Sequence, residues 1–211
     1  APADDPAHPL LHGGEGGVLI HVGPLEGALG PDELRRAAEA ALASGGRELR
    51  CLAWEFAPDL AGRAADLEAE LGLVITLVWI PRELLEPNRP AAAFFEAGLV
   101  ECELIERDGA FDVRLAHFAP ALAATDRRPA LRERAAAAPL DFLDCWAIDF
   151  AWAEGAPFAY HWQACRERPG GPLSLRSDIG WRPEDGGPFR IGVKAIDVFG
   201  FESLAVLEAP R

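Results

Sequence analysis

The chain has 211 residues, half of them hydrophobic, so it has enough apolar material for one large domain or two small ones. Its formal net charge is −14, and phosphate backbones attract surplus Lys and Arg, so this balance disfavours a stand-alone nucleic-acid binder. All 20 basic residues except Lys194 are Arg, and their uneven spread leaves room for a local basic patch.

The four cysteines, Cys51, Cys102, Cys145 and Cys165, have no CxxC spacing, and each lies in an apolar run. This pattern predicts small buried hydrophobes in a reducing cytoplasm. No apolar run approaches the ~20 residues of a membrane span, and the first residues lack the order of a signal peptide. The chain has no methionine, so we expect it to be a segment of a larger polypeptide. The expected location, the cytoplasm, rests on the cysteine pattern.

The N-terminal part alternates short apolar runs with amphipathic stretches. Residues 1–16 are rich in Pro, Gly and Asp and are expected to be a flexible lead-in. After them the pattern predicts strands at 18–22, 49–56 and 73–80, separated by helices that begin near Pro31 and Pro58. Such β-α-β-α-β alternation predicts a parallel sheet in an α/β domain covering residues 17–120.

The rest of the chain has a strand-like period of two. Residues 99–106 and 111–118 are expected to form a hairpin, because Asp108-Gly109 favours a tight turn. Residues 121–140 are Ala/Arg-rich and are interpreted as a connector with a short helix at 129–138. From 141 to 211, short strands separated by Gly, Pro and Asp clusters predict an antiparallel β-sandwich, similar to an immunoglobulin or PKD-type module.

One candidate site is a pocket at the strand ends of the α/β domain. Trp54-Glu55 closes the second strand and Arg82-Glu83 follows the third. Open α/β sheets bind ligands at the carboxyl ends of their strands, so these four side chains are candidates for a pocket. A structural salt bridge is the alternative interpretation of the same charges.

A second candidate is a mixture of aromatic and basic residues near the C-terminus. Trp152, Trp162 and Trp181 are interspersed with arginines, of which Arg166, Arg168 and Arg176 are the candidates for DNA or partner binding. Bases stack on aromatic rings and Arg pairs with phosphate, so this mixture is the best candidate for a nucleic-acid surface. Core packing is the alternative explanation of the tryptophans.

Other chemical signatures are missing from the sequence. The glycine-rich loop 23–30 follows a strand and precedes a helix, but it matches neither GxGxxG nor a P-loop and is interpreted as a turn. The histidines lack ligand spacing, so no metal site is predicted, and His21 is interpreted as a satisfied strand-end histidine.

Several sequence blocks, taken in order, resemble the C-terminal region of large bacterial adenine-specific, type III-like DNA methyltransferases. The blocks are Ile20-His21-Val22-Gly23, Leu52-Ala53-Trp54-Glu55-Phe56, Ile80-Pro81-Arg82-Glu83, Phe94-Phe95-Glu96, Asp144-Cys145-Trp146-Ala147-Ile148-Asp149, His161-Trp162-Gln163-Ala164-Cys165-Arg166, and Val193-Lys194-Ala195-Ile196-Asp197-Val198-Phe199-Gly200. They cover roughly residues 18–206.

The resemblance implies a region that follows a catalytic domain using S-adenosylmethionine. The methyl-transfer tetrapeptide and the FxGxG cofactor loop of that family do not occur here, so no catalytic residue or cofactor is carried over to this segment. The expected role is therefore non-catalytic: target recognition, subunit contact or docking, with a protein partner or the parent enzyme's domains favoured over DNA by the net charge.

Two alternatives stay open. One is a small α/β hydrolase or nucleotide-binding enzyme that uses the strand ends near Glu55 and Arg82. The other is a purely structural sandwich module, in which substituting Trp162 or Arg166 would change stability but no partner.

Overall fold

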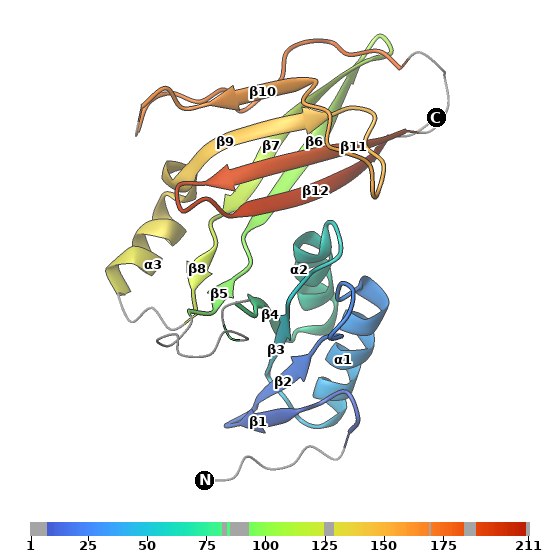
Figure 1. Ribbon diagram of the computed structural model, residues 1–211, viewed down its shortest axis with the longest axis vertical. Coiled ribbons are helices and arrows are strands. Elements are labelled where there is room, and N and C mark those ends of the chain that lie inside the picture. The colour runs from blue at the N-terminus through green and yellow to red at the C-terminus, as the bar shows by residue number, and fades with distance from the viewer. Residues whose placement is uncertain are drawn as a thin grey trace. The chain divides into compact units, whose positions relative to one another are not determined.

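The computed structural model describes residues 8–81, 84, 93–124, 129–168, 170–183 and 189–209. The chain divides into two compact units (Figure 1). Unit 1 spans Ala1–Ala97 and Leu122–Arg127, and unit 2 spans Gly98–Ala121 and Arg128–Arg211. Each unit is described by itself.

Unit 1 contains a mixed sheet. Its strands are β1 (Gly13–Glu15), β2 (Val18–Val22), β3 (Glu48–Ala53), β4 (Val74–Trp79), β5 (Phe95–Glu96) and β8 (Leu122–Ala123), in that spatial order. β2, β3 and β4 pair in parallel, whereas β1, β5 and β8 add antiparallel pairs. Together with the helices this confirms the predicted mixed α/β character.

Two helices connect the parallel strands of unit 1. α1 (Pro31–Ala43) begins with Pro31, and Asp32 and Glu33 in its first turn suit the helix dipole. α2 (Leu60–Leu71) ends at Gly72, whose φ of 66° is the left-handed conformation that glycine adopts without steric cost. The predicted positions of both helices are thus close to those observed.

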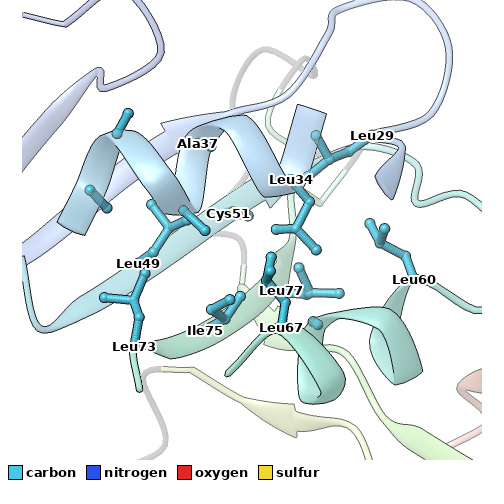
Figure 2. Close-up of a cluster of buried hydrophobic side chains, with 14 of the residues drawn as sticks. Leu29, Leu34, Ala37, Leu49, Cys51, Leu60, Leu67, Leu73, Ile75 and Leu77 are labelled. Atoms are coloured by element: carbon cyan, nitrogen blue, oxygen red, sulfur yellow. The ribbon is translucent and has the colours of Figure 1, made fainter. Parts of the chain in front are cut away.

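The core of unit 1 lies between these helices and the parallel strands. Figure 2 shows Leu34 and Ala37 of α1 and Leu67 of α2 meeting side chains of β3 and β4, including Leu49 and Leu77. Leu34, Ala37 and Leu49 are at most 1% exposed. Burial of such residues is the main favourable contribution to folding, at roughly 25 cal/mol per Å² of apolar surface.

The predicted flexible lead-in is partly wrong. Residues 1–7 lie outside the described residues, but β1 falls within the lead-in and Leu11 is only 4% exposed. His21, 1% exposed, holds this segment: its Nδ1 lies 2.8 Å from the Leu10 carbonyl oxygen and its Nε2 lies 3.1 Å from Glu33 Oε1. The interpretation of His21 as a satisfied histidine is confirmed.

Unit 2 is built from antiparallel strands. Its four-stranded sheet has the order β10 (Trp162–Cys165), β9 (Leu143–Asp149), β11 (Phe189–Asp197) and β12 (Glu202–Ala209). β6 (Leu99–Arg107) and β7 (Ala110–Ala119) form a separate hairpin. At its turn Asp108 and Gly109 both have positive φ, 52° and 70°, as a tight Asp-Gly hairpin turn requires.

The hairpin belongs to a different unit from the one predicted. It was expected within the α/β domain of residues 17–120, but Gly98–Ala121 groups with unit 2. Sequence proximity favoured the α/β part, whereas the hairpin's long-range partners lie later in the chain: Phe111 and Trp181 bond each other's backbone in both directions. The expected connector, 121–140, contributes β8, α3 (Pro129–Ala137) and part of a 3₁₀ turn (Pro139–Phe142).

The cysteine prediction is wrong for two of the four residues. Cys145 and Cys165 form a disulfide between β9 and β10. Their separation of 20 residues matches no common motif, and only the strand register brings them together. Cys51 is buried as expected, and burial raises the pKa of its thiol to about 12. None of the helices in the described residues combines the length and apolarity needed to cross a membrane.

Candidate functional site

The predicted aromatic–basic residues of unit 2 do not gather into one surface. Trp162 is half-buried and packs edge-on against Trp146, with ring centroids 4.6 Å apart. Trp181 stacks on Phe150 at 4.9 Å, and Trp152 is only 8% exposed. The three tryptophans therefore pack within unit 2, which favours the structural interpretation of these side chains.

Arg166 is surrounded by backbone carbonyl groups. Its Nε donates to Leu143 O at 2.7 Å, its Nη2 donates to Leu140 O at 2.7 Å, and its Nη1 donates to Gly171 O. The planar guanidinium thus ties the end of β10 to the 3₁₀ turn before β9 and to the loop after β10. This arrangement uses the donors that a phosphate would need.

The two other predicted arginines differ from each other. Arg176 is half-buried, with Nη2 3.3 Å from Asp112 Oδ2 and Nε 2.7 Å from Asp178 Oδ1, so two carboxylates offset its charge. Arg168 is exposed. Of the four predicted DNA- or partner-binding residues, Arg168 alone presents a mostly exposed side chain.

The predicted strand-end pocket is described only in part. Trp54 and Glu55 directly follow β3, whereas Arg82 and Glu83 lie outside the described residues. The backbone of Glu55 accepts a hydrogen bond from Leu29 N at 2.9 Å, so the glycine-rich loop closes over this strand end. Leu29 itself is fully buried, which agrees with the interpretation of the loop as a turn.

Unit 1 has a hollow of about 510 Å³ at a different place, between α1 and α2. Its lining combines acidic and basic side chains with apolar ones: Asp32, Arg35, Arg63, Asp66 and Glu70, with Pro31, Leu34 and Leu67. Arg35 donates two hydrogen bonds to Glu70, at 2.9 and 2.7 Å, and this contact lowers the pKa of Glu70. Neither Trp54 nor Glu55 lines the hollow.

Sequence reasoning missed the role of Asp112. This residue is 9% exposed and accepts hydrogen bonds from Ser177 Oγ at 2.9 Å, Ile179 N at 2.8 Å and Gly180 N at 3.0 Å. Burial alone would raise the pKa of this carboxyl, but these bonds and the Arg176 guanidinium together hold it below its ordinary value. Asp112 therefore anchors the 176–180 loop to β7 as a carboxylate.

Two further buried aspartates hold loops in the same way. Asp149, 3% exposed, accepts from Ala151 N at 3.0 Å and Ala159 N at 2.8 Å, which fixes the loop after β9. Asp197, also 3% exposed, accepts from Phe199 N and Phe201 N at 2.9 Å each and from Ala121 N at 3.0 Å. Burial raises the pKa of Asp197 despite these donors.

The turn held by Asp197 exposes two large apolar side chains. Val198 is 50% exposed and Phe199 is 46% exposed, and we call this pair the β11–β12 tip. Val198 N donates to Phe142 O at 2.8 Å, and the Phe142 and Phe199 rings lie 5.9 Å apart. The tip is therefore apolar, exposed and fixed in conformation. In the sequence this turn is Asp197-Val198-Phe199-Gly200-Phe201-Glu202, where apolar residues occupy positions that are usually polar.

Among the described residues, no three His, Cys, Asp or Glu side chains are grouped as a metal ion would require.

The chain matches no protein-family model, and no curated protein matches it either. Among solved structures it is similar to the crystal structure of the Clostridium perfringens spore cortex lytic enzyme SleM. That match has 11% sequence identity and a TM-score of 0.29, and it covers 92% of this chain and 67% of the other. At so low a TM-score, nothing about this chain's fold or activity follows from the likeness.

Proposed function

We propose that this chain is a non-catalytic accessory region of a bacterial adenine-specific DNA methyltransferase, and that it acts by contacting the catalytic part of that enzyme. S-adenosylmethionine would bind in the catalytic domain and not in this segment. The observation that carries the proposal is the ordered series of sequence blocks, from Ile20-His21 to Phe199-Gly200, that resembles the C-terminal region of those enzymes.

The location of the blocks supports a resemblance of the whole region. Six of the seven blocks fall in β2, at the end of β3, in β5, β9 and β10, and in β11 with its turn, so both units contribute. The seventh, Ile80-Pro81-Arg82-Glu83, begins directly after β4, and its last two residues lie outside the described residues. Several block residues have a structural role. Asp149 and Asp197 accept hydrogen bonds from loops, and Arg166 donates hydrogen bonds to three carbonyl groups. Residues of this kind stabilise the fold, so finding them in the blocks suits an accessory region whose fold is shared with those methyltransferases.

The β11–β12 tip supports protein contact over DNA contact. Interface cores are enriched in aromatic and apolar side chains that are fixed before binding, and Phe199 and Val198 meet both conditions. The net charge of −14 repels a phosphate backbone. We therefore assign the tip to the contact with the catalytic part of the methyltransferase.

Two finer assignments belong to the same proposal. Unit 2, with its four-stranded sheet and its hairpin, would be a variant of the immunoglobulin or PKD-like sandwich, which is typically an interaction module. The protein would work in the cytoplasm, where the DNA substrate of the methyltransferase is found.

Methyl transfer tests this role directly. The catalytic region of a methyltransferase of this family, prepared without its own C-terminal region, is assayed with duplex DNA and radiolabelled S-adenosylmethionine. We expect this chain, added in trans, to raise methylation of the DNA, and to transfer no methyl group when it is alone.

Tight binding of S-adenosylmethionine by the isolated chain, measured by calorimetry, would contradict the accessory role. So would a catalytic region whose rate of methylation does not change at any concentration of added chain.

A further inference from the structure

The disulfide between Cys145 and Cys165 has a position that suits reversible chemistry. The two residues lie directly opposite each other in neighbouring antiparallel strands, with their Cα atoms 4.1 Å apart. Side chains of directly opposite residues point to the same face of a sheet, so two thiols here meet without any backbone movement. The pair therefore comes together in the folded chain whether or not the bond is present.

The cystine lies on the face of the sheet opposite to the Trp146 side chain. Trp146 and Ile148, the next inward-facing residues of β9, are fully buried, so Cys145 points to the opposite face. Cys145 is half-buried and Cys165 is exposed, so Cys165 is the residue at which we expect a thiol from solution to attack. Of the two free cysteines, Cys51 is fully buried and Cys102 is half-buried.

The cystine fastens a strand at the edge of the sheet. β10 has four residues and, among the described strands, pairs with β9 alone. Other contacts hold both of its ends: His161 N donates to Ile148 O at 3.0 Å before the strand, and Arg166 N donates to Asp144 O at 2.9 Å after it. Loss of the disulfide would therefore loosen β10 without releasing it.

We propose that Cys145–Cys165 is a redox-reversible site that controls the order of β10, with a small-molecule or protein dithiol as its reductant. This proposal rests on the proposed function, because disulfides in a reducing cytoplasm are usually transient or redox-sensing, whereas those of exported proteins are structural. In the reduced state β10, which carries Trp162 and leads into Arg166, becomes more mobile.

The exchange balances in two steps. A thiolate of the dithiol attacks Sγ of Cys165, which forms a mixed disulfide and releases Cys145 as a thiolate that takes up a proton. The second thiol of the reductant then attacks the mixed disulfide, releasing Cys165 and leaving the reductant oxidised. Two electrons and two protons pass to the chain, and an oxidised dithiol reverses both steps.

The test uses the intact chain, purified without reductant and then incubated with excess dithiothreitol under native conditions. Free thiols are alkylated and located by peptide mass mapping. We expect Cys145 and Cys165 to become labelled together after reduction, and to lose this labelling after reoxidation without denaturant. Cys51 is the internal control, because its buried thiol should stay unlabelled in both states.

Hydrogen exchange and thermal unfolding then measure the effect on β10. Amides of residues 162–165 should exchange faster in the reduced chain, while those of β3 in unit 1 keep their rates. The melting temperature should fall by roughly 5–10 °C. The double variant Cys145→Ser with Cys165→Ser should match the reduced chain and not respond to dithiothreitol.

Three results would overturn the proposal. The disulfide could resist dithiothreitol until the chain is unfolded, reduction could unfold unit 2 altogether, or both thiols could stay free in oxidised buffer. None of these results bears on the methylation assay, so failure of the redox site can be distinguished from failure of the accessory role.

Discussion

Asp112, Asp149 and Asp197 are buried carboxylates whose partners are mostly backbone N–H groups of loops. Backbone N–H groups that leave a sheet need acceptors, and a single carboxylate serves two or three of them. An Asp within an apolar strand therefore indicates that a loop packs back onto the sheet and donates hydrogen bonds to its carboxylate. The sequence shows these residues but not which loop each one holds, because the partners of Asp112 lie more than 60 residues away.

Replacing Asp112 by Asn should destabilise unit 2 by about 2 kcal/mol or more, because the amide offers a donor where Arg176 and backbone groups already donate. The pKa of Asp112 is lowered in the folded chain, so its stabilising effect is present above the ordinary value of 3.8 and is lost as the pH falls through the lowered pKa. Urea unfolding at several pH values measures both effects.

Asp108→Asn is the matched control, since Asp108 is exposed at the hairpin turn and Asn also tolerates positive φ. It should unfold like the wild type at neutral pH. Equal stability of the Asp112 and Asp108 variants would contradict the anchoring role of Asp112.

Arg166→Lys separates a structural role from a phosphate-binding one. A single ammonium cannot reach the three carbonyls of Leu140, Leu143 and Gly171, so at least one buried acceptor loses its donor and stability should fall by about 1–3 kcal/mol. The exposed Arg168→Lys should change the free energy of unfolding by less than about 0.5 kcal/mol.

Chemical unfolding and a fluorescence anisotropy titration with duplex DNA are run on both variants. The structural account fails if Arg166→Lys keeps its stability and instead weakens DNA binding.

At the scale of elements, the outer face of β11 is covered by an aromatic side chain. A Cβ at Gly192 would lie 2.4 Å from Cδ1 of Trp152, closer than real contacts allow. Arg190 lies over the same indole, with Cζ 4.8 Å from the ring centroid. Glycine is needed at this position of the strand because the indole lies directly on the backbone.

Gly192→Ala should therefore displace Trp152 and destabilise unit 2 by roughly 1–3 kcal/mol. Tryptophan fluorescence during thermal unfolding reports both the displacement and the lower melting temperature. Gly13→Ala is the control, because a Cβ there meets nothing within 4 Å. If Gly192→Ala unfolds at the wild-type temperature, this close packing is not important for stability.

Local patterns predicted the elements of unit 1 well. The strands and helices at 18–80 follow from apolar runs, Pro31 at a helix start and Gly72 at a helix end, all of which depend on neighbouring residues. The 99–119 hairpin was also predicted, since Asp108-Gly109 defines its own turn. Its assignment to unit 2 depends on contacts with residues near 176 and 181, which no local pattern contains.

At the scale of the whole molecule, the candidate sites were harder to predict than the fold. Trp162, Arg166 and Arg176 were chosen by residue type, but their side chains turn to Trp146, to carbonyls and to carboxylates. The β11–β12 tip was missed because an exposed Phe in a turn has no chemical signature in one sequence. The type and spacing of residues predicted the strands and helices. The exposure and the direction of the side chains were known only from the tertiary structure.

The most direct test of the accessory role is the affinity of this chain for the catalytic region of a methyltransferase of the family, measured by isothermal titration calorimetry. The account predicts a one-to-one complex that the double variant Val198→Ser with Phe199→Ser weakens about tenfold or more, because the tip supplies the apolar contact. Tyr160→Ser, which removes another exposed aromatic, should leave the affinity unchanged. No complex, or a complex that the tip variant binds as tightly as the wild type, would contradict it.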